Sequence, residues 1–316
     1  MQRGVIRIGT CSWAEKSLIE SGSFYPEEVS SPEQRLRYYA GHFDTVEVDS
    51  SFYAIPTAHM VSAWAERTPP GYLFHLKAYG ALTGHGVDPR SLPPELRGLL
   101  PAADRDQENV HVSDPALLKA LAQASVEACQ PLRAAHRLGF IVFQFPPWFG
   151  FKKANLDYLL YCKELMAGLP VAVEFRHGSW LTHHHAGTVF DFLRQHRTTY
   201  IACDEPQYGS LATAPLLPEI TSAMAYLRLH GRNAENWLSH ATPRYDYLYQ
   251  EEELAHLLRI ARQLSERARM TFIMFNNCHA GQAVRNALQL QGMLQGAALM
   301  RQDEATSPPL PADRAE

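Results

Sequence analysis

The most informative segment of this 316-residue chain is Val171-Ala172-Val173-Glu174-Phe175-Arg176-His177-Gly178-Ser179-Trp180. Its first residues form a β-rich run, which predicts a strand. Glu174 and Arg176 lie two residues apart, so a strand points both side chains to the same side. A carboxylate and a guanidinium that face one way before a Gly-Ser turn favour the mouth of a catalytic barrel over a plain surface, because the same pattern recurs along the chain.

Similar segments occur on both sides of this one and alternate with helical patterns. The expected strands are residues 5–10, 45–50, 72–77, 140–147, 171–176, 198–204, 225–232 and 271–277. The expected helices are residues 31–41, 57–67, 114–137, 155–167, 183–193, 250–266 and 281–299. Eight strands that alternate with helices predict an α/β fold, a (β/α)₈ barrel of the TIM type.

The domain organisation follows from the same pattern. We expect a single barrel domain over residues 1–300, because no linker divides it. Residues 81–113 are rich in proline, glycine and charge and are too long for an ordinary connection, so we interpret them as an extended excursion after the third strand. Residues 301–316 have the composition of a disordered tail.

Composition argues against several classes of protein. The net charge of −4 gives no basic face, so a dedicated nucleic-acid binder is disfavoured. The chain has no apolar run of the roughly 20 residues that a membrane helix needs, and no signal-peptide pattern at its start. Its five cysteines are odd in number and show no CxxC spacing, which is typical of free thiols in a reducing compartment. We therefore expect a cytoplasmic protein.

Polar residues occupy nearly every expected strand end, and in such a barrel the catalytic residues lie at the carboxyl ends of the strands. The residues expected to be catalytic are Glu47, Glu174, Asp204 and His230. The residues expected to bind substrate are Lys77, Gln144, Arg176, Arg228, Asn276, Asn277, Trp13 and Trp180. Isolated buried charges are very unfavourable, so the carboxylates and cations of this mouth must pair.

Several of these residues also allow other interpretations. Glu174 and Arg176 could form an internal salt bridge that fixes the strand end, and Glu47 with Glu174 could be the carboxylate pair of a glycosidase. Glu47, Glu174, Asp204 and His230 could together bind a divalent metal. The neighbouring arginines and lysine compete for those carboxylates, so we assign no metal or other cofactor. We interpret residues 183–185, three consecutive histidines, as a solvated helix start, because consecutive helix residues point in different directions.

Lys77, two cysteines and the aromatic residues near the strand ends have alternatives of their own. We favour anion contact or ion pairing over a Schiff base for Lys77, since nearby carboxylates raise the pKa of a lysine rather than lower it. Cys11 and Cys203 are interpreted as buried, inert thiols. The aromatic residues either roof a pocket or pack under loops, and they are Trp13, Trp148, Trp180, Phe52 and Tyr53.

The motifs of this chain resemble those of the YecE-like family, also named domain of unknown function 72. The resemblance rests on residues 9–13 (GTCSW), 24–26 (FYP), 42–53 (HFDTVEVDSSFY), 144–147 (QFPP), 174–180 (EFRHGSW), 228–232 (RLHGR) and 275–277 (FNN). It covers about residues 7–290. It implies a TIM-type barrel with a shared polar pocket, and it supplies no reaction.

We therefore expect an enzyme that acts on a small polar anionic substrate, such as a phosphate, a carboxylate or a sugar acid. Glu174 or Glu47 would be the general base, and His230 would transfer a proton. Hydrolysis, lyase chemistry and isomerisation are all compatible. The alternatives are a metal-dependent isomerase or endonuclease-like barrel and a non-catalytic ligand-binding protein. A nuclease would need a basic rim, for which the candidates are Arg90, Arg97, Arg105 and Arg232.

Overall fold

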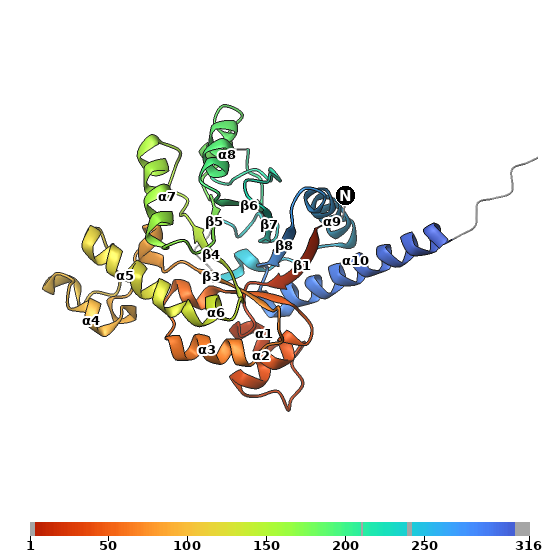
Figure 1. The fold of residues 1–316 in the computed structure, drawn as a ribbon, viewed down its shortest axis with the longest axis horizontal. Coiled ribbons are helices and arrows are strands. Elements are labelled where there is room, and N and C mark those ends of the chain that lie inside the picture. Colours follow the sequence, from red (N-terminus) through yellow and green to blue (C-terminus); the bar gives the residue numbers. More distant parts are fainter. Residues whose placement is uncertain (1–3, 210, 239–241, 307–316) are drawn as a thin grey trace, which may run out of the picture.

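A computed structural model describes residues 4–209, 211–238 and 242–306 of the chain. Within these residues, eight parallel strands form one sheet at the centre of the molecule, with helices around it (Figure 1). The strands are β1 Val5–Thr10, β2 Thr45–Val48, β3 Leu73–Lys77, β4 Leu138–Gln144, β5 Val171–Glu174, β6 Thr199–Asp204, β7 Met224–Leu229 and β8 Met270–Phe275. Their hydrogen-bonded order is β1-β8-β7-β6-β5-β4-β3-β2. This nearly closed parallel sheet confirms the predicted (β/α)₈ barrel.

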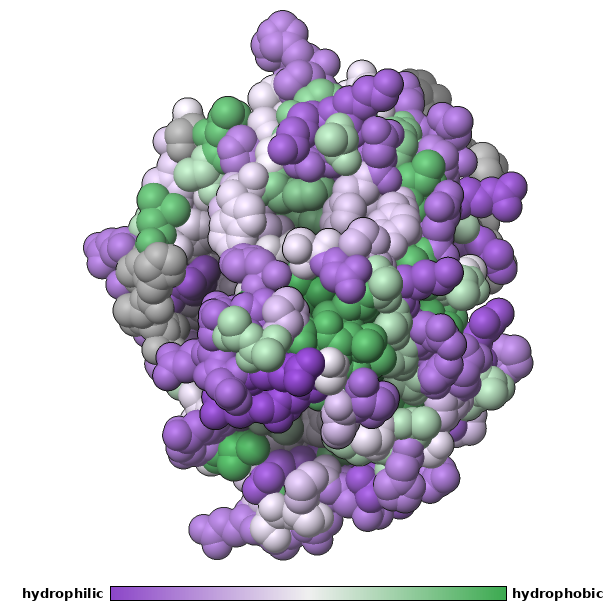
Figure 2. Space-filling view, turned by 90° about the vertical axis from the view of Figure 1, so that its left-hand side faces the viewer, coloured by the Kyte–Doolittle hydropathy of each residue, from purple (hydrophilic) through white to green (hydrophobic). Residues whose placement is uncertain are grey.

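Helices connect the strands. They are α1 Lys16–Glu20, α2 Pro32–Ala40, α3 Ala58–Glu66, α4 Pro94–Arg97, α5 Pro115–Ala128, α6 Gln130–Ala134, α7 Lys153–Leu165, α8 Ala186–Gln195, α9 Glu251–Ser265 and α10 Gln282–Thr306. Short 3₁₀ turns add η1 Asp49–Phe52, η2 Gly80–Thr83, η3 Pro89–Ser91, η4 Ala102–Asp104, η5 Gly178–Leu181, η6 Thr242–Tyr245 and η7 His279–Gly281. The side of the molecule that α4, α5 and α7 occupy is largely hydrophilic, with a hydrophobic group near its middle (Figure 2).

Local sequence explains where the helices begin and where one expected helix divides. Ser31 and Gln34 form a capping box at the start of α2, and Pro32 occupies its first turn. The single helix expected over residues 114–137 is instead two helices, α5 and α6, that meet at Cys129. Pro131 causes the break, since a proline has no N–H to donate to the preceding turn.

Two further segments differ in detail from the expectation. The excursion at residues 81–113 contains η3, α4 and η4, and an antiparallel bridge between Val87 and Val110 closes it. Helix α10 is described through Thr306, and residues 307–316 of the expected disordered tail lie outside the described residues. None of the described helices is both long enough and apolar enough to cross a membrane.

Alternation along the strands sorts side chains into two sets. One set packs inside the barrel and includes Cys11, Phe140, Val142, Ala172, Ile201, Cys203, Tyr226, Phe272 and Met274. The other set packs between the strands and the surrounding helices in a larger apolar core. Residues two positions beyond an inward residue also point inward. This period of two determines which polar residues reach the mouth of the barrel.

The barrel has a seam between β1 and β2, which lie side by side although no ladder of hydrogen bonds joins their described residues. Gly9 allows this close approach. A Cβ atom at this position would lie 2.3 Å from the carbonyl oxygen of Thr45, which is far inside van der Waals contact. The seam therefore depends on a residue without a side chain.

We predict that Gly9→Ala destabilises the protein by about 1–3 kcal/mol, because the added methyl group forces β1 away from β2. Chemical denaturation measures the free energy of unfolding. The control is Gly187→Ala on α8, where an added Cβ meets no atom within 4 Å. An equal effect of the two substitutions would contradict the close approach at the seam.

Candidate active site at the barrel mouth

Arg228, which projects inward from β7, is the centre of a buried polar network at the carboxyl ends of the strands. Its side chain is fully buried, and it donates to carboxylate oxygens of Glu174 on β5 and Glu47 on β2. The Nη2–Oε1 distance to Glu47 is 2.7 Å. Nη1 also donates to Oε1 of Gln144 on β4, at 3.0 Å. One guanidinium therefore joins four strands across the barrel.

Arg176 forms the second half of the network. Its Nε donates to Oε1 of Glu174, and its Nη1 donates to Oε2 of Glu205 at 3.2 Å. Burial alone would raise the pKa of the Glu174 carboxyl, but Arg176 and Arg228 together hold that pKa well below its ordinary value. Glu174 is thus a permanent anion that orients two arginines.

His230, two residues beyond Arg228, lies beside Glu174 as a neutral ring. Its Nδ1 lies 2.8 Å from Nδ2 of Asn276 and 3.5 Å from Nη2 of Arg176. An arginine nitrogen can only donate, so Nδ1 is the acceptor and Nε2 carries the proton. Nε2 lies 3.3 Å from Oε1 of Glu174, although the pair is not aligned for a hydrogen bond. Burial and the charge of Arg176 lower the pKa of His230 to about 3.

Glu205 is a buried carboxyl at this mouth that we did not predict. It directly follows β6, and its side chain accepts from Arg176 and from the backbone N–H of Ala214, at 2.8 Å. Burial raises the pKa of Glu205 to about 7, and Arg176 offsets part of that rise. The inward position of Cys203 on β6, two residues earlier, is the signal that would have identified Glu205.

Glu47 is a second carboxyl with a raised pKa. Its Oε2 accepts from the hydroxyl of Tyr226 at 2.9 Å. Burial raises the pKa of Glu47 to about 7, although Arg228 lowers it, and the nearby carboxylate of Asp49 adds to the rise. The buried network contains three glutamates, at 47, 174 and 205, and two arginines, at 176 and 228. Two guanidinium charges balance two carboxylates, so the third carboxyl favours its protonated form.

Lys77 lies at the rim of this network and is placed for ion pairing. Its Nζ donates to Oε1 of Gln144 at 3.1 Å and lies 3.9 Å from Oδ1 of Asp49. It also lies 4.8 Å from the centre of the Phe52 ring. These contacts agree with the preference for ion pairing over a Schiff base.

Four residues that we expected at the site face away from it. Asp204 accepts hydrogen bonds from Nε and Nη2 of Arg232 and one from the hydroxyl of Tyr249, at 2.7 Å. Asn277 donates to the carbonyl oxygen of Tyr247. The reason is the strand period, since Asp204 and Asn277 each adjoin an inward residue.

The remaining two are aromatic and pack in the buried apolar core. Trp13 packs edge to face against Trp64, with 5.6 Å between ring centroids. Trp180 is fully buried and stacks on Phe175 at 4.3 Å. Neither indole therefore covers the mouth of the barrel. Both pack in the interior of the protein instead.

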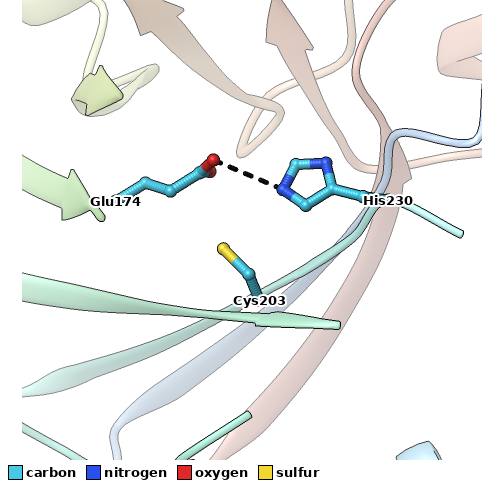
Figure 3. A group of neighbouring side chains, drawn as sticks. All are labelled: Glu174, Cys203 and His230. Carbon is cyan, nitrogen blue, oxygen red and sulfur yellow. Dashed lines mark ion pairs between the residues drawn. The ribbon is translucent and has the colours of Figure 1, made fainter. Parts of the chain in front are cut away.

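Glu174, Cys203 and His230 are the one group of possible metal ligands found among the described residues, with ligand atoms within 4.8 Å of one another. Figure 3 shows Glu174 and His230 facing each other, with the Cys203 sulfur beside them. Both oxygens of Glu174 already accept from guanidinium groups. Burial and nearby carboxylates raise the pKa of the Cys203 thiol, and a metal needs the thiolate. This donor set therefore fits a cation poorly.

The four arginines that are candidates for the basic rim of a nuclease each have a partner within the chain. Arg232 pairs with Asp204 and with Glu253, and Arg90 pairs with Asp88. In the excursion, Arg105 donates to the carbonyl oxygens of Leu100 and Gly98, and Arg97 donates to the carbonyl oxygen of Arg105.

The histidines at 183 and 184 are exposed and precede α8, whereas the imidazole of His185 contacts the carbonyl oxygen of Ser179 at 2.8 Å.

A cavity of about 440 Å³ opens above the network. Its polar lining comes from Arg176, Glu205, Gln144, His85 and Arg244. Its apolar and aromatic lining comes from Pro147, Trp148, Ala212, Trp237, Leu238 and Tyr245. The cavity thus meets the buried network at Arg176, Glu205 and Gln144. Sequence reasoning missed Trp237, Arg244 and Tyr245, because they lie in the irregular segment after β7.

Comparison with known proteins finds one family over nearly the whole chain. The family model described as "Protein of unknown function DUF72" matches residues 7–312. The UPF0759 protein YunF of Bacillus subtilis is 30% identical over 296 residues, which are 92% of this chain and 95% of that protein.

Solved structures agree with this match. A DUF72 family protein from Thermotoga maritima has a TM-score of 0.73 and 32% identity, over 92% of this chain and 99% of that one. Another, from Enterococcus faecalis, has a TM-score of 0.75 and 26% identity, over 92% of this chain and 96% of that one.

We predict that Arg228→Met destabilises the protein by about 3–5 kcal/mol, because it leaves two buried carboxylates without their shared cation. Urea denaturation measures the free energy of unfolding. Arg37→Met is the control, since the pair of Arg37 with Glu33 is about half exposed and worth less than about 1 kcal/mol. Equal losses in the two variants would contradict the central place of Arg228.

A second prediction concerns pH. The pKa of Glu205 in the folded protein, about 7, exceeds its ordinary value of 4.5, so the folded state binds this proton more tightly. Stability from this carboxyl is complete below about pH 4.5 and is lost as pH rises through 7. The wild-type protein therefore loses stability over this range, whereas the glutamine side chain of a Glu205→Gln variant does not titrate. Between pH 4.5 and pH 8 we expect the free energy of unfolding of Glu205→Gln to rise by about 3 kcal/mol relative to that of wild type.

Denaturation at both pH values measures this gain. Glu127→Gln, which changes an exposed side chain on α5, should follow wild type at each pH. A difference between Glu205→Gln and wild type that stays constant with pH would show that the carboxyl titrates alike in the folded and unfolded states.

Proposed function

This chain belongs to the DUF72 family, and we propose that it is an enzyme whose active site is the cavity at the barrel mouth and whose substrate is a small polar anion. The observation that carries the proposal is that one cavity contains both Arg176 and Glu205. A fixed cation and a carboxyl with a pKa near 7 are the groups needed to hold an anion and move a proton beside it.

The charges of the lining favour an anion. Arg176 and Arg244 each contribute a positive charge, while Glu205, with a pKa of about 7, is only partly ionised near neutral pH. A planar guanidinium matches the two oxygens of a carboxylate or phosphate group. We propose that Arg244 and the exposed edge of Arg176 bind the anionic group of the substrate.

Glu205 is the proposed general acid and base, in place of Glu174. The pKa of Glu174 is held low by two arginines, and its side chain is fully buried, so it is a weak base without access to substrate. Glu205 lines the cavity, and a pKa near the working pH suits both proton removal and proton return. We propose that Glu174 and Asn276 are positioning residues, because they hold Arg176 and His230.

The proposal also includes the cellular compartment in which the enzyme works. The described chain holds five cysteines as free thiols, which supports a reducing, cytoplasmic setting. The metal-dependent alternative receives little support from a donor set whose carboxylate is held by arginines. A non-catalytic ligand-binding role shares the same cavity and differs only in that the ligand is recovered unchanged.

We predict that a thermal-shift screen of phosphates, carboxylates and sugar acids identifies an anion that stabilises the wild-type protein. Arg244→Gln should weaken its binding about tenfold or more, because a charge-assisted hydrogen bond is lost. Arg133→Gln on α6, outside the cavity lining, is the control. If no anion in the set binds, the proposed substrate class is wrong.

A further prediction separates the enzyme from a binding protein. Glu205→Gln should retain the anion but abolish its conversion, as followed by mass spectrometry of the recovered ligand. For a carboxylate whose charge is constant between pH 6 and 8, wild-type affinity should fall as pH rises, because Glu205 becomes an anion. The variant should lose this pH dependence. A ligand that wild type returns unchanged would favour the binding protein.

A further inference from the structure

The cavity at the mouth has a second half that the proposed function does not use. We propose that the anion bound there carries a planar aromatic ring, which lies among Trp148, Trp237 and Tyr245. This inference rests on the proposed function and narrows its substrate class. The shared chemistry is a ring bearing a carboxylate or a phosphate.

The ring side chains of the cavity come from three separate segments. Trp148 follows β4, Trp237 and Tyr245 follow β7, and His85 follows β3. Trp237 and Tyr245 lie 6.1 Å apart at 86°, and His85 and Trp148 lie 5.6 Å apart at 64°. In an edge-to-face pair one ring turns only its edge to the other, so the pairing itself does not cover the faces of that ring.

Trp148 is unusual because the residue is 67% exposed while it forms part of a cavity wall. The neighbouring cavity residue Leu238 is 63% exposed. Large apolar side chains gathered at one concave place mark a binding surface more often than singly scattered ones do. Covering these two side chains with a ligand ring would remove apolar area from water, which is favourable.

The distances place the ring and the anion within one small molecule. The guanidinium carbon of Arg176 lies 5.5 Å from the Trp237 ring centre, and that of Arg244 lies 5.8 Å from the Tyr245 ring centre. Each guanidinium lies over the face of its aromatic residue, so a ligand ring that meets the edge of Trp237 or Tyr245 can direct its acidic substituent to that guanidinium. The cavity volume of about 440 Å³ is typical of sites for ring-sized ligands rather than for a bare anion.

His85 supports a flat ligand as well. Burial, together with the charges of Lys77 and Arg176, lowers the pKa of His85 to about 4, so the imidazole is neutral near pH 7. A neutral imidazole contributes little attraction for an anion but can contact a ring. The Phe52 ring lies 4.9 Å from that of His85, and Oγ1 of Thr83 lies 2.8 Å from its Nδ1, so two neighbours hold the imidazole in place.

Isothermal titration of the full chain with matched probes tests this inference. The probes are benzoate, cyclohexanecarboxylate and acetate, together with phenyl phosphate and inorganic phosphate. The saturated ring is the more hydrophobic, so a preference of about fivefold or more for benzoate reports aromatic contact. Phenyl phosphate should likewise bind about tenfold more tightly than inorganic phosphate.

Two variants locate the contact. Trp148→Ala should remove most of the preference for aromatic probes and leave acetate and inorganic phosphate unchanged. Tyr53→Ala is the matched control, because Tyr53 is 70% exposed and lies outside the cavity lining. Both side chains are exposed, so neither substitution should unfold the barrel.

The outcomes separate the two proposals. If acetate and phosphate bind as tightly as the ring probes, or if the saturated ring matches the aromatic one, the ring inference is wrong and the anion site stands. A preference that survives Trp148→Ala would also overturn it. If none of the probes binds, the proposed function and this inference both fail.

Discussion

The guanidinium of Arg228 is the interaction on which the mouth of this barrel depends. A buried charge is tolerated only when it is paired and hydrogen-bonded, and Arg228 pairs with carboxylates from two other strands while it also donates to Gln144. The side chain thereby fixes how β2, β4, β5 and β7 lie relative to one another. Arg176 likewise pairs with two buried carboxylates, those of Glu174 and Glu205, and it also lines the cavity.

The numbers of positive and negative groups in the network determine which carboxyl can keep a proton near pH 7. Three glutamates share two arginines, so one carboxyl retains a proton near pH 7 more readily than an exposed glutamate does. Glu174 lies between both arginines and remains ionised, and the raised pKa falls on Glu47 and Glu205. Of these two, Glu205 lines the cavity. Packing thus determines which carboxyl is available for proton transfer.

The fold could be predicted from the sequence because strand and helix patterns alternate throughout it. The strand period of two also explains why Glu174 with Arg176, and Arg228 with His230, point into one buried network. On β6 the same period assigns the inward positions to Cys203 and Glu205, so the expected site residue Asp204 lies on the outer side. Trp237 and Tyr245 could not be placed, since they follow β7 in a segment without periodicity, and only tertiary packing brings them to the cavity.

Asp204 and Glu205 are consecutive acids that face opposite sides of the barrel wall. Arg232 and Tyr249 hold the first among the outer helices, and Arg176 holds the second inside. Side-chain interactions on both sides of the barrel wall consequently hold the peptide between these two residues. A change at Arg232 would therefore act on the inner acid through this peptide, although Arg232 itself lies outside the lining of the cavity.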